Sequence, residues 1–276
     1  MKKISLLVTG ASTGIGRAIA LDFAREGHQV FASVRKDSDA RSLTTENAEI
    51  TPLVFDVTDG NGIRRGVEAV ERLLKLGQPF SLINNAGIAV AGPLEELPMA
   101  DFRRQFEINV FGALETTQAF FPLVRKDKGR IVNMSSVSGL MTMPFLGAYC
   151  SSKFALEALS EALRQELSAE GIKVLLIEPG PIQTPIWDKN FTAARTEVSA
   201  RYAGAVARFE KLVRKLAVSG LPVERVVVAV RRALLETAPP ERQVVTRLQG
   251  RLELEIGRRL PSRWLDKIVV SQLFKS

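Results

Sequence analysis

Hydrophobic and polar positions along the first 185 residues alternate between two patterns. Short, nearly continuous apolar runs are typical of buried strands. Between several of these runs, apolar residues recur at the spacing of amphipathic helices. The expected strands are residues 4–8, 28–34, 50–55, 80–83, 130–134 and 173–177, and the expected helices follow residue 16 and span residues 62–76, 99–124 and the segment from 147. This alternation predicts an α/β protein whose single domain is a doubly wound parallel sheet.

The pattern changes after Pro185. Residues 186–220 carry no strand signal and mix aromatic with charged side chains, which predicts either a helical substrate-binding lid or an ordinary pair of connecting helices. Residues 223–235 have helical spacing, and residues 243–246 predict an edge strand. Pro261 interrupts an amphipathic pattern near the C-terminus. We therefore expect a catalytic domain over residues 1–248 and a C-terminal extension of amphipathic helices over residues 249–276.

Glycines cluster between the first expected strand and the first expected helix, in Thr9-Gly10-Ala11-Ser12-Thr13-Gly14-Ile15-Gly16. A strand, a glycine turn and a helix place backbone N–H groups and a helix N-terminus against a phosphate. Glycine lacks the Cβ that would keep a ligand at a distance. The arrangement predicts a nucleotide site in a Rossmann fold, beyond the carboxyl ends of the strands.

The cysteine and histidine content excludes several kinds of site. One cysteine, Cys150, cannot form an internal disulfide, and one histidine, His28, cannot build a multi-histidine metal site, so no metal is expected. His28 lies in a polar stretch before an apolar run and is expected to be a solvated turn residue. No apolar run reaches the length of a transmembrane helix or of a signal peptide's core, so a cytoplasmic protein is expected.

The net charge of +8 is concentrated near the C-terminus, where residues 242–276 hold eight Lys or Arg against three acidic residues. No nucleic-acid-reading motif accompanies these charges, and we expect no nucleic-acid partner. Basic residues flank apolar ones over residues 251–276, which suits peripheral contact with an anionic membrane. The same pattern also fits a cap on the pocket, a subunit contact or a solvated basic face.

Tyr149 and Lys153 stand four residues apart at the start of an expected helix and so project from one face. An ammonium close to a phenol favours the phenolate, which predicts a lowered Tyr149 pKa and a side chain able to exchange a proton with an alcohol or carbonyl oxygen. Taken alone, the two residues fit an ordinary surface pair better, because this spacing is common by chance. Glu157, Glu161 and Arg164 fall on the side of the expected helix opposite its apolar residues, which are Ala155, Ala158, Leu159, Ala162 and Leu163.

An ordered set of motifs over roughly residues 4–185 resembles the short-chain dehydrogenase/reductase family. The motifs are Thr9-Gly10-x-x-x-Gly14-Ile15-Gly16, Asn84-Asn85-Ala86-Gly87, Asn109, Ser136, Tyr149-x-x-x-Lys153 and Pro179-Gly180. The residues around Tyr149 and after Pro179 look most like the hydroxysteroid and retinol dehydrogenase branch. The resemblance implies hydride transfer between a nicotinamide and a carbonyl or alcohol, and a homodimer or homotetramer.

The resemblance also implies roles for individual residues. Tyr149 would be the general acid and base, and Lys153 would lower its pKa and bind the nicotinamide ribose. Ser136, which matches the family spacing better than Ser135, would orient the substrate oxygen. Asn109 would hold a water in a proton relay, and a polar residue in its apolar helical run itself suggests a specific hydrogen bond. The implied cofactor-binding residues are Gly10, Ser12, Thr13, Gly14, Ile15, Gly16, Arg35, Asp56, Val57, Asn85, Ala86, Gly87, Tyr149, Lys153, Pro179, Gly180, Ile182 and Thr184.

The choice of cofactor follows from the end of the second expected strand. NAD sites place a carboxylate there to bind the ribose 2′-hydroxyl, whereas this chain has Val34 and then Arg35. A guanidinium suits a 2′-phosphate through paired charged hydrogen bonds. The sequence therefore predicts NADP(H). By resemblance, Asp56 and Val57 would contact the adenine.

The substrate-binding residues are the least specified. Ser136 and Tyr149 would hold the reacting oxygen, while Met141, Phe145 and Trp187 would supply apolar contacts for a lipophilic ketone, aldehyde or alcohol. The apolar residues between 140 and 146 fit core packing equally well. Two other functions stay open: a 3-oxoacyl thioester reductase, and a nucleotide-binding regulator or scaffold without turnover.

Overall fold

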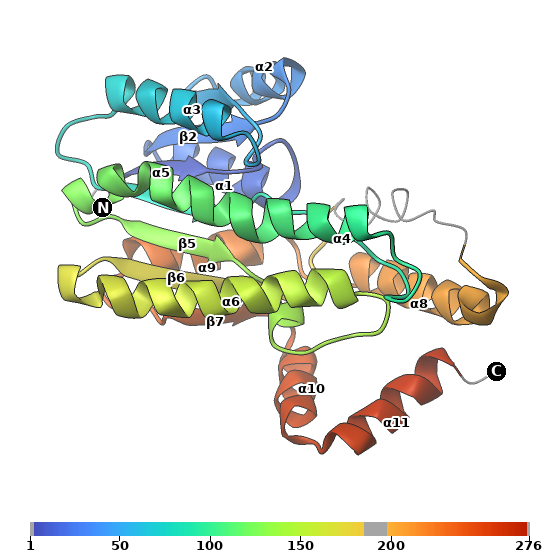
Figure 1. Cartoon of the computed structure of the whole chain (residues 1–276). Coiled ribbons are helices and arrows are strands. Elements are labelled where there is room, and N and C mark those ends of the chain that lie inside the picture. The colour runs from blue at the N-terminus through green and yellow to red at the C-terminus, as the bar shows by residue number, and fades with distance from the viewer. Residues whose placement is uncertain (1–2, 185–197, 275–276) are drawn as a thin grey trace.

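The computed structural model describes residues 3–184 and 198–274. Within these residues, the strands form one parallel sheet in the order β3-β2-β1-β4-β5-β6-β7 (Figure 1). The strands are β1 (Ser5–Val8), β2 (Gln29–Val34), β3 (Ile50–Val54), β4 (Phe80–Asn84), β5 (Arg130–Met134), β6 (Lys173–Pro179) and β7 (Arg242–Val245). The predicted doubly wound parallel sheet is confirmed, and β7 is the edge strand expected near residue 243.

The order of the strands positions a crevice. β1 pairs with β2 on one side and with β4 on the other, so that Ser5 lies opposite both Gln29 and Phe80. The chain therefore builds the sheet outward in opposite directions from β1, first through β2 and β3 and then through β4 to β7. In such sheets the crevice for a ligand opens at the carboxyl ends of the strands where the direction reverses.

Helices cover both faces of the sheet (Figure 1). α1 (Gly14–Arg25), α2 (Asp37–Glu46) and α9 (Glu224–Leu235) contribute to one apolar core, which contains Ile19 and Val230. α3 (Gly60–Leu73), α5 (Gly112–Lys126) and α6 (Gly147–Leu167) contribute to the other, which contains Ile63 and Phe120. Shorter helical elements complete this part: α4 (Met99–Phe106), η1 (Glu107–Phe111), η2 (Val137–Gly139) and η3 (Ser168–Glu170).

The structure corrects two local expectations. The helix expected over residues 99–124 is interrupted by a π-helical turn, η1, which contains Asn109. His28 is buried rather than solvated, because its Nδ1 accepts a hydrogen bond from the Ile4 amide at 3.2 Å and its ring packs 5.3 Å from that of Phe23. Burial, reinforced by the charges of Lys3 and Arg231, lowers the His28 pKa, so the imidazole favours its neutral form.

The C-terminal part adds α8 (Ala200–Val218) before α9, and α10 (Leu248–Arg259) and α11 (Ser262–Leu273) after β7. Pro261 directly precedes α11, so the predicted break in the tail is confirmed. Residues 185–197, including the predicted substrate contact Trp187, lie outside the described residues. Among the residues that the structure describes, no helix is both long enough and apolar enough to cross a bilayer.

Candidate active site

The glycine turn between β1 and α1 is held in a shape that side chains larger than hydrogen would not permit. Gly10 and Gly14 have φ angles of +67° and +59°, a region that disfavours residues with a Cβ. A Cβ on Gly10 would also lie 2.8 Å from the Cα of Ala86. Thr9 secures this contact, because its Oγ1 accepts hydrogen bonds from the Asn85 and Ala86 amides at 2.9 and 3.0 Å.

A cavity of about 380 Å³ opens beside the glycine turn, at the carboxyl ends of the strands. Twelve predicted cofactor residues line it: Gly10, Ser12, Thr13, Gly14, Ile15, Arg35, Asp56, Val57, Asn85, Ala86, Gly87 and Thr184. The predicted residues Gly16, Pro179, Gly180, Ile182, Tyr149 and Lys153 do not line it. Gly16 instead packs beneath the turn, where a Cβ would collide with the Asn85 side chain. The cavity therefore lies in the glycine-turn half of the predicted site.

The chemistry of the cavity fits a dinucleotide that carries an additional phosphate. Val34 ends β2 as a buried residue, and Arg35 follows it as an exposed cation on the cavity wall. Asp56 keeps its carboxylate in place by accepting hydrogen bonds from the amide and the hydroxyl of Thr58 at 3.0 and 2.9 Å. The α4 residues Asp101 and Arg104 also line the cavity; they precede Asn109 on a helix, and motif matching did not identify them.

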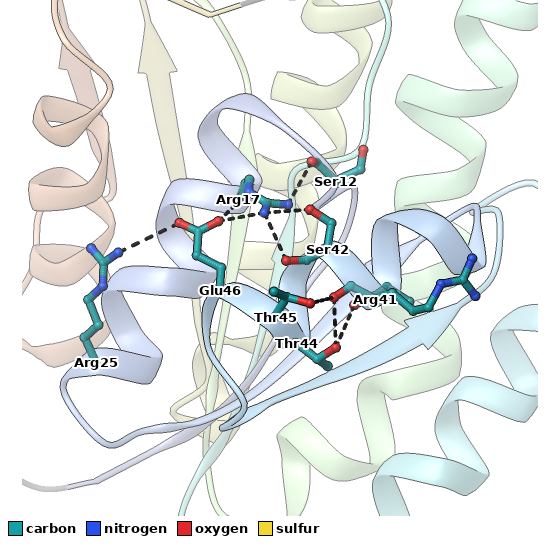
Figure 2. A network of polar contacts seen from close by, with 9 residues as sticks. Ser12, Arg17, Arg25, Arg41, Ser42, Thr44, Thr45 and Glu46 are labelled. Carbon is teal, nitrogen blue, oxygen red and sulfur yellow. Dashed lines mark hydrogen bonds and ion pairs between the residues drawn. The ribbon is translucent and has the colours of Figure 1, made fainter.

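Arg17 braces the glycine turn from the side of α2. Its guanidinium donates to the Ser12 carbonyl at 3.4 Å and to the Ser42 hydroxyl at 3.0 Å, and its Nη2 lies 2.6 Å from the Glu46 carboxylate. Figure 2 shows these contacts converging on Arg17, with Arg25 on the far side of Glu46. One side chain thus fixes the glycine turn to the helix that follows Arg35.

Tyr149, Ser136 and Lys153 are all buried at the second half of the predicted site. The Tyr149 phenol hydrogen-bonds to the hydroxyl of Ser136, whereas the buried Ser135 hydroxyl has no hydrogen-bond partner among the residues that the structure describes. Lys153 donates from Nζ to the Met134 carbonyl at 2.7 Å, and this ammonium lies 5.9 Å from the centre of the Tyr149 ring. The fold therefore brings together Ser136, Tyr149 and Lys153, although Ser136 and Lys153 are seventeen positions apart in the sequence.

The protonation of this group differs from the sequence-based expectation. Burial raises the pKa of Tyr149 to about 12, although the hydrogen bond from Ser136 acts to lower it. Burial also lowers the pKa of Lys153 to about 8, against the charge of Glu157. The predicted lowering of the Tyr149 pKa by Lys153 is wrong for this structure, because removing both groups from water disfavours phenolate and ammonium alike.

Asn109 makes the specific bonds that its polar side chain suggested. Its Oδ1 accepts from the Ile88 amide at 2.9 Å, and its Nδ2 donates to the Ile88 carbonyl at 2.9 Å and to the Ser152 hydroxyl at 3.2 Å. Ser152 in turn donates to the Tyr149 carbonyl at 2.7 Å. Gln105, one helical turn before Asn109 and fully buried, binds the Val90 amide and the Ile88 carbonyl at 2.6 and 2.7 Å. Motif spacing predicts neither Gln105 nor Ser152; for Gln105, the available signal is a second polar residue four positions before Asn109.

An acidic pair lies behind Lys153. Glu157, one turn further along α6, was expected on the solvated side of the helix but is buried. It pairs with Arg242 of β7, which also donates to the buried Glu178 of β6 at 3.0 Å. Burial, together with the charge of Glu157, raises the pKa of Glu178 to about 7. Glu157, which sequence spacing predicts on the solvated side of α6, therefore faces the interior and acts on Lys153.

The segment between Ser136 and Tyr149 is enclosed by the C-terminal helices. Phe145 is buried, has a φ of +65°, and packs 5.6 Å from the ring of Phe209 on α8 and 5.6 Å from that of Phe274 after α11. Met141 lies against α10, where a Cβ on Gly257 would be 2.8 Å from its sulfur. Neither Met141 nor Phe145 lines the cavity beside the glycine turn.

Comparison with known proteins agrees with this arrangement. Residues 5–195 match the family model described as short chain dehydrogenase. The chain belongs to the short-chain dehydrogenase family.

The known proteins that resemble this chain differ in how much of their length it covers. An NADPH-dependent 3-dehydrocapnine reductase of Ornithobacterium rhinotracheale is 38% identical over 98% of this short-chain dehydrogenase and 97% of the relative. Human retinol dehydrogenase 5 is 36% identical over 66% of this chain and 57% of its own. The crystal structure of a short-chain dehydrogenase from Streptomyces avermitilis superposes with a TM-score of 0.78 at 30% identity, covering 97% of this chain and 96% of that one.

Proposed function

We propose that this short-chain dehydrogenase is an NADP(H)-dependent oxidoreductase that transfers a hydride between the nicotinamide and a lipophilic ketone or aldehyde, or the corresponding alcohol. The observation that carries the proposal is the buried Tyr149–Ser136 hydrogen bond, with Lys153 one helical turn along α6. The cavity beside the glycine turn, at the carboxyl ends of the strands, supports a bound dinucleotide. NADP(H), when bound, supplies or accepts the hydride.

Tyr149 is the proposed proton donor to the substrate oxygen. Its raised pKa keeps the phenol protonated at neutral pH, which is the form that carbonyl reduction requires. Ser136 orients the same oxygen and stabilises charge that develops on it. Lys153 binds the nicotinamide ribose and stabilises the phenolate left after proton transfer. Asn109 positions the Ile88 backbone and, through Ser152, the backbone of Tyr149; its implied role in holding a relay water belongs to the same proposal.

The cofactor and substrate classes rest on separate observations. Arg35 at the cavity and the absence of a carboxylate at Val34 support NADP(H), as does the NADPH-dependent relative. The apolar surroundings of Phe145, shared with Tyr149 in one buried cluster, support a lipophilic substrate. Met141, Phe145 and Trp187 are the proposed apolar contacts, and a homodimer or homotetramer is the proposed assembly.

The test is a panel of lipophilic ketones, aldehydes and alcohols, with a 3-oxoacyl thioester included, followed by NADPH absorbance. We expect carbonyl reduction that Tyr149→Phe abolishes while NADPH affinity stays close to that of the wild type. Preference for the thioester would replace the proposed substrate class. Complete inactivity of a protein that binds NADPH would favour the regulator or scaffold.

A further inference from the structure

α10 carries apolar side chains on the side that faces away from the protein. Leu254 and Gly257 form its buried face. Leu248, Leu252 and Ile256 recur every four residues on the opposite face, and each is more than half exposed. A surface helix normally presents polar residues opposite its buried face, so packing within this chain does not account for the outer stripe.

α11 repeats this arrangement. Leu273 and Val269 attach it to the apolar cluster around Phe145, and Arg208 of α8 donates to the Leu273 carbonyl at 2.8 Å. Trp264 and Ile268, one turn apart on another side of the helix, are about half exposed. Figure 1 shows α10 and α11 projecting together from one side of the molecule, beyond α6 and α8. We call the five exposed residues, Leu248, Leu252, Ile256, Trp264 and Ile268, the outer surface.

Exposed cations surround the outer surface. Residues 247–274 carry six cationic and three acidic side chains, a net charge of +3. The cations are Arg247, Arg251, Arg258, Arg259, Arg263 and Lys267, all of them exposed. Within the described residues only Arg259 of this group forms an ion pair, at 3.8 Å to Glu255. The remaining positive charge is therefore available to an external partner.

The charge discriminates between two occupants of this surface. A second copy of the chain would bring an identical positive region against it, and like charges repel. An anionic bilayer would neutralise the cations while accepting the apolar side chains and the indole at its interface. We propose that α10 and α11 form a docking surface for anionic lipid bilayers, with the helices lying in the membrane interface.

On the inner side, Gly257 of α10 lies against Met141, and Phe274, directly after α11, packs on Phe145. A docked bilayer would therefore lie beside the segment that precedes Tyr149. Delivery of a lipophilic substrate from the bilayer follows only if the proposed function is correct, whereas docking itself does not depend on it.

The test is sedimentation of the full-length protein with phosphatidylcholine vesicles, with and without phosphatidylserine, at low and high salt. We expect at least about tenfold stronger binding to the anionic vesicles at low salt, lost at high salt. The variant Leu252→Glu/Ile256→Glu should lose this binding. Arg258→Gln/Lys267→Gln should weaken it by about fivefold for each charge removed.

Leu76→Glu is the matched control, because Leu76 is a highly exposed leucine distant in sequence, in the turn before β4. It should bind vesicles as the wild type does, and all variants should retain NADPH binding and their far-ultraviolet circular dichroism. Absence of wild-type binding to anionic vesicles would overturn the proposal, as would equal loss in Leu76→Glu. A lower oligomeric mass of Leu252→Glu/Ile256→Glu, with vesicle binding intact, would assign the surface to a second copy instead.

Discussion

The substitution Lys153→Met tests whether the buried ammonium, which the proposed reaction requires, lowers the stability of the folded protein. Lys153 is buried with a pKa lowered to about 8, so its ammonium is retained at neutral pH against desolvation. Methionine has a similar length and no charge. We expect the substitution to abolish turnover and weaken NADPH affinity while leaving the protein at least as stable at neutral pH.

The magnitude follows from the difference between the folded and unfolded pKa values. A fall from 10.5 to about 8 costs about 3 kcal/mol at pH 7. In the variant, removal of this cost stabilises the fold, but loss of the hydrogen bond from Lys153 Nζ to the Met134 carbonyl offsets about 1–3 kcal/mol of that gain. The variant should therefore match the wild type or exceed its stability by up to about 2 kcal/mol at pH 7.

The pH dependence gives the sharper test. Between the two pKa values the unfolded chain binds more protons than the folded one, so wild-type stability gains from Lys153 as pH rises from about 8 to 10.5. The variant lacks this gain. Relative to the wild type, it should lose about 2 kcal/mol between about pH 7 and about pH 9.5.

Urea unfolding followed by circular dichroism at both pH values measures these differences. Lys126→Met, at an exposed position on α5, controls for general effects of removing a lysine. It should track the wild type at both pH values. A Lys153→Met protein that is several kcal/mol less stable at neutral pH, by an amount that does not change at high pH, would refute the reasoning.

Three further predictions test other parts of the site. Ser136→Ala removes the hydrogen bond that lowers the Tyr149 pKa; we expect carbonyl reduction about 10²-fold slower at pH 7, with NADPH affinity unchanged by fluorescence titration. Arg35→Ala should lower kcat/KM for NADPH by about 10–100-fold and leave that for NADH nearly unchanged; an equal loss for both would contradict the 2′-phosphate assignment. Arg242→Met leaves two buried glutamates without their cation and should cost about 3 kcal/mol in urea unfolding. Because protonation relieves that cost, the loss should be larger above the Glu178 pKa of about 7 than at pH 5, and a loss independent of pH would exclude the charge explanation.

The sequence predicts the sheet because the signal for each strand, a run of apolar residues, lies within a short stretch of the chain. The parallel strands are buried on both faces and so read as continuous apolar runs, as in β1. The hydrophobic pattern did not predict α2, because Ala40 and Leu43 are its only buried residues and two positions are too few to produce a helical period. Its position depends instead on Arg17 and Glu46, a pairing between distant segments that no window of sequence contains.

The residues of the candidate site also divide into those that the sequence predicts and those that it does not. Order and spacing of motifs predicted Ser136 and Tyr149, which the fold brings together, and twelve of the residues that line the glycine-turn cavity. They did not identify Gln105, which joins α4 to the segment after β4, or Ser152, which joins α6 to the π-helical turn through Asn109. Residues that act by holding backbone in place leave no chemical motif.

Protonation is the property that spacing predicts least well. Four residues on a helix bring Lys153 and Tyr149 near each other, and in water the ammonium would stabilise the phenolate. In the folded chain both groups lose solvent, and desolvation outweighs their attraction. The carboxylate that acts to keep Lys153 charged is Glu157, whose own counter-ion Arg242 comes from the edge strand β7, 85 positions later. The charge state of a motif lysine in this short-chain dehydrogenase thus depends on how the far end of the sheet is assembled.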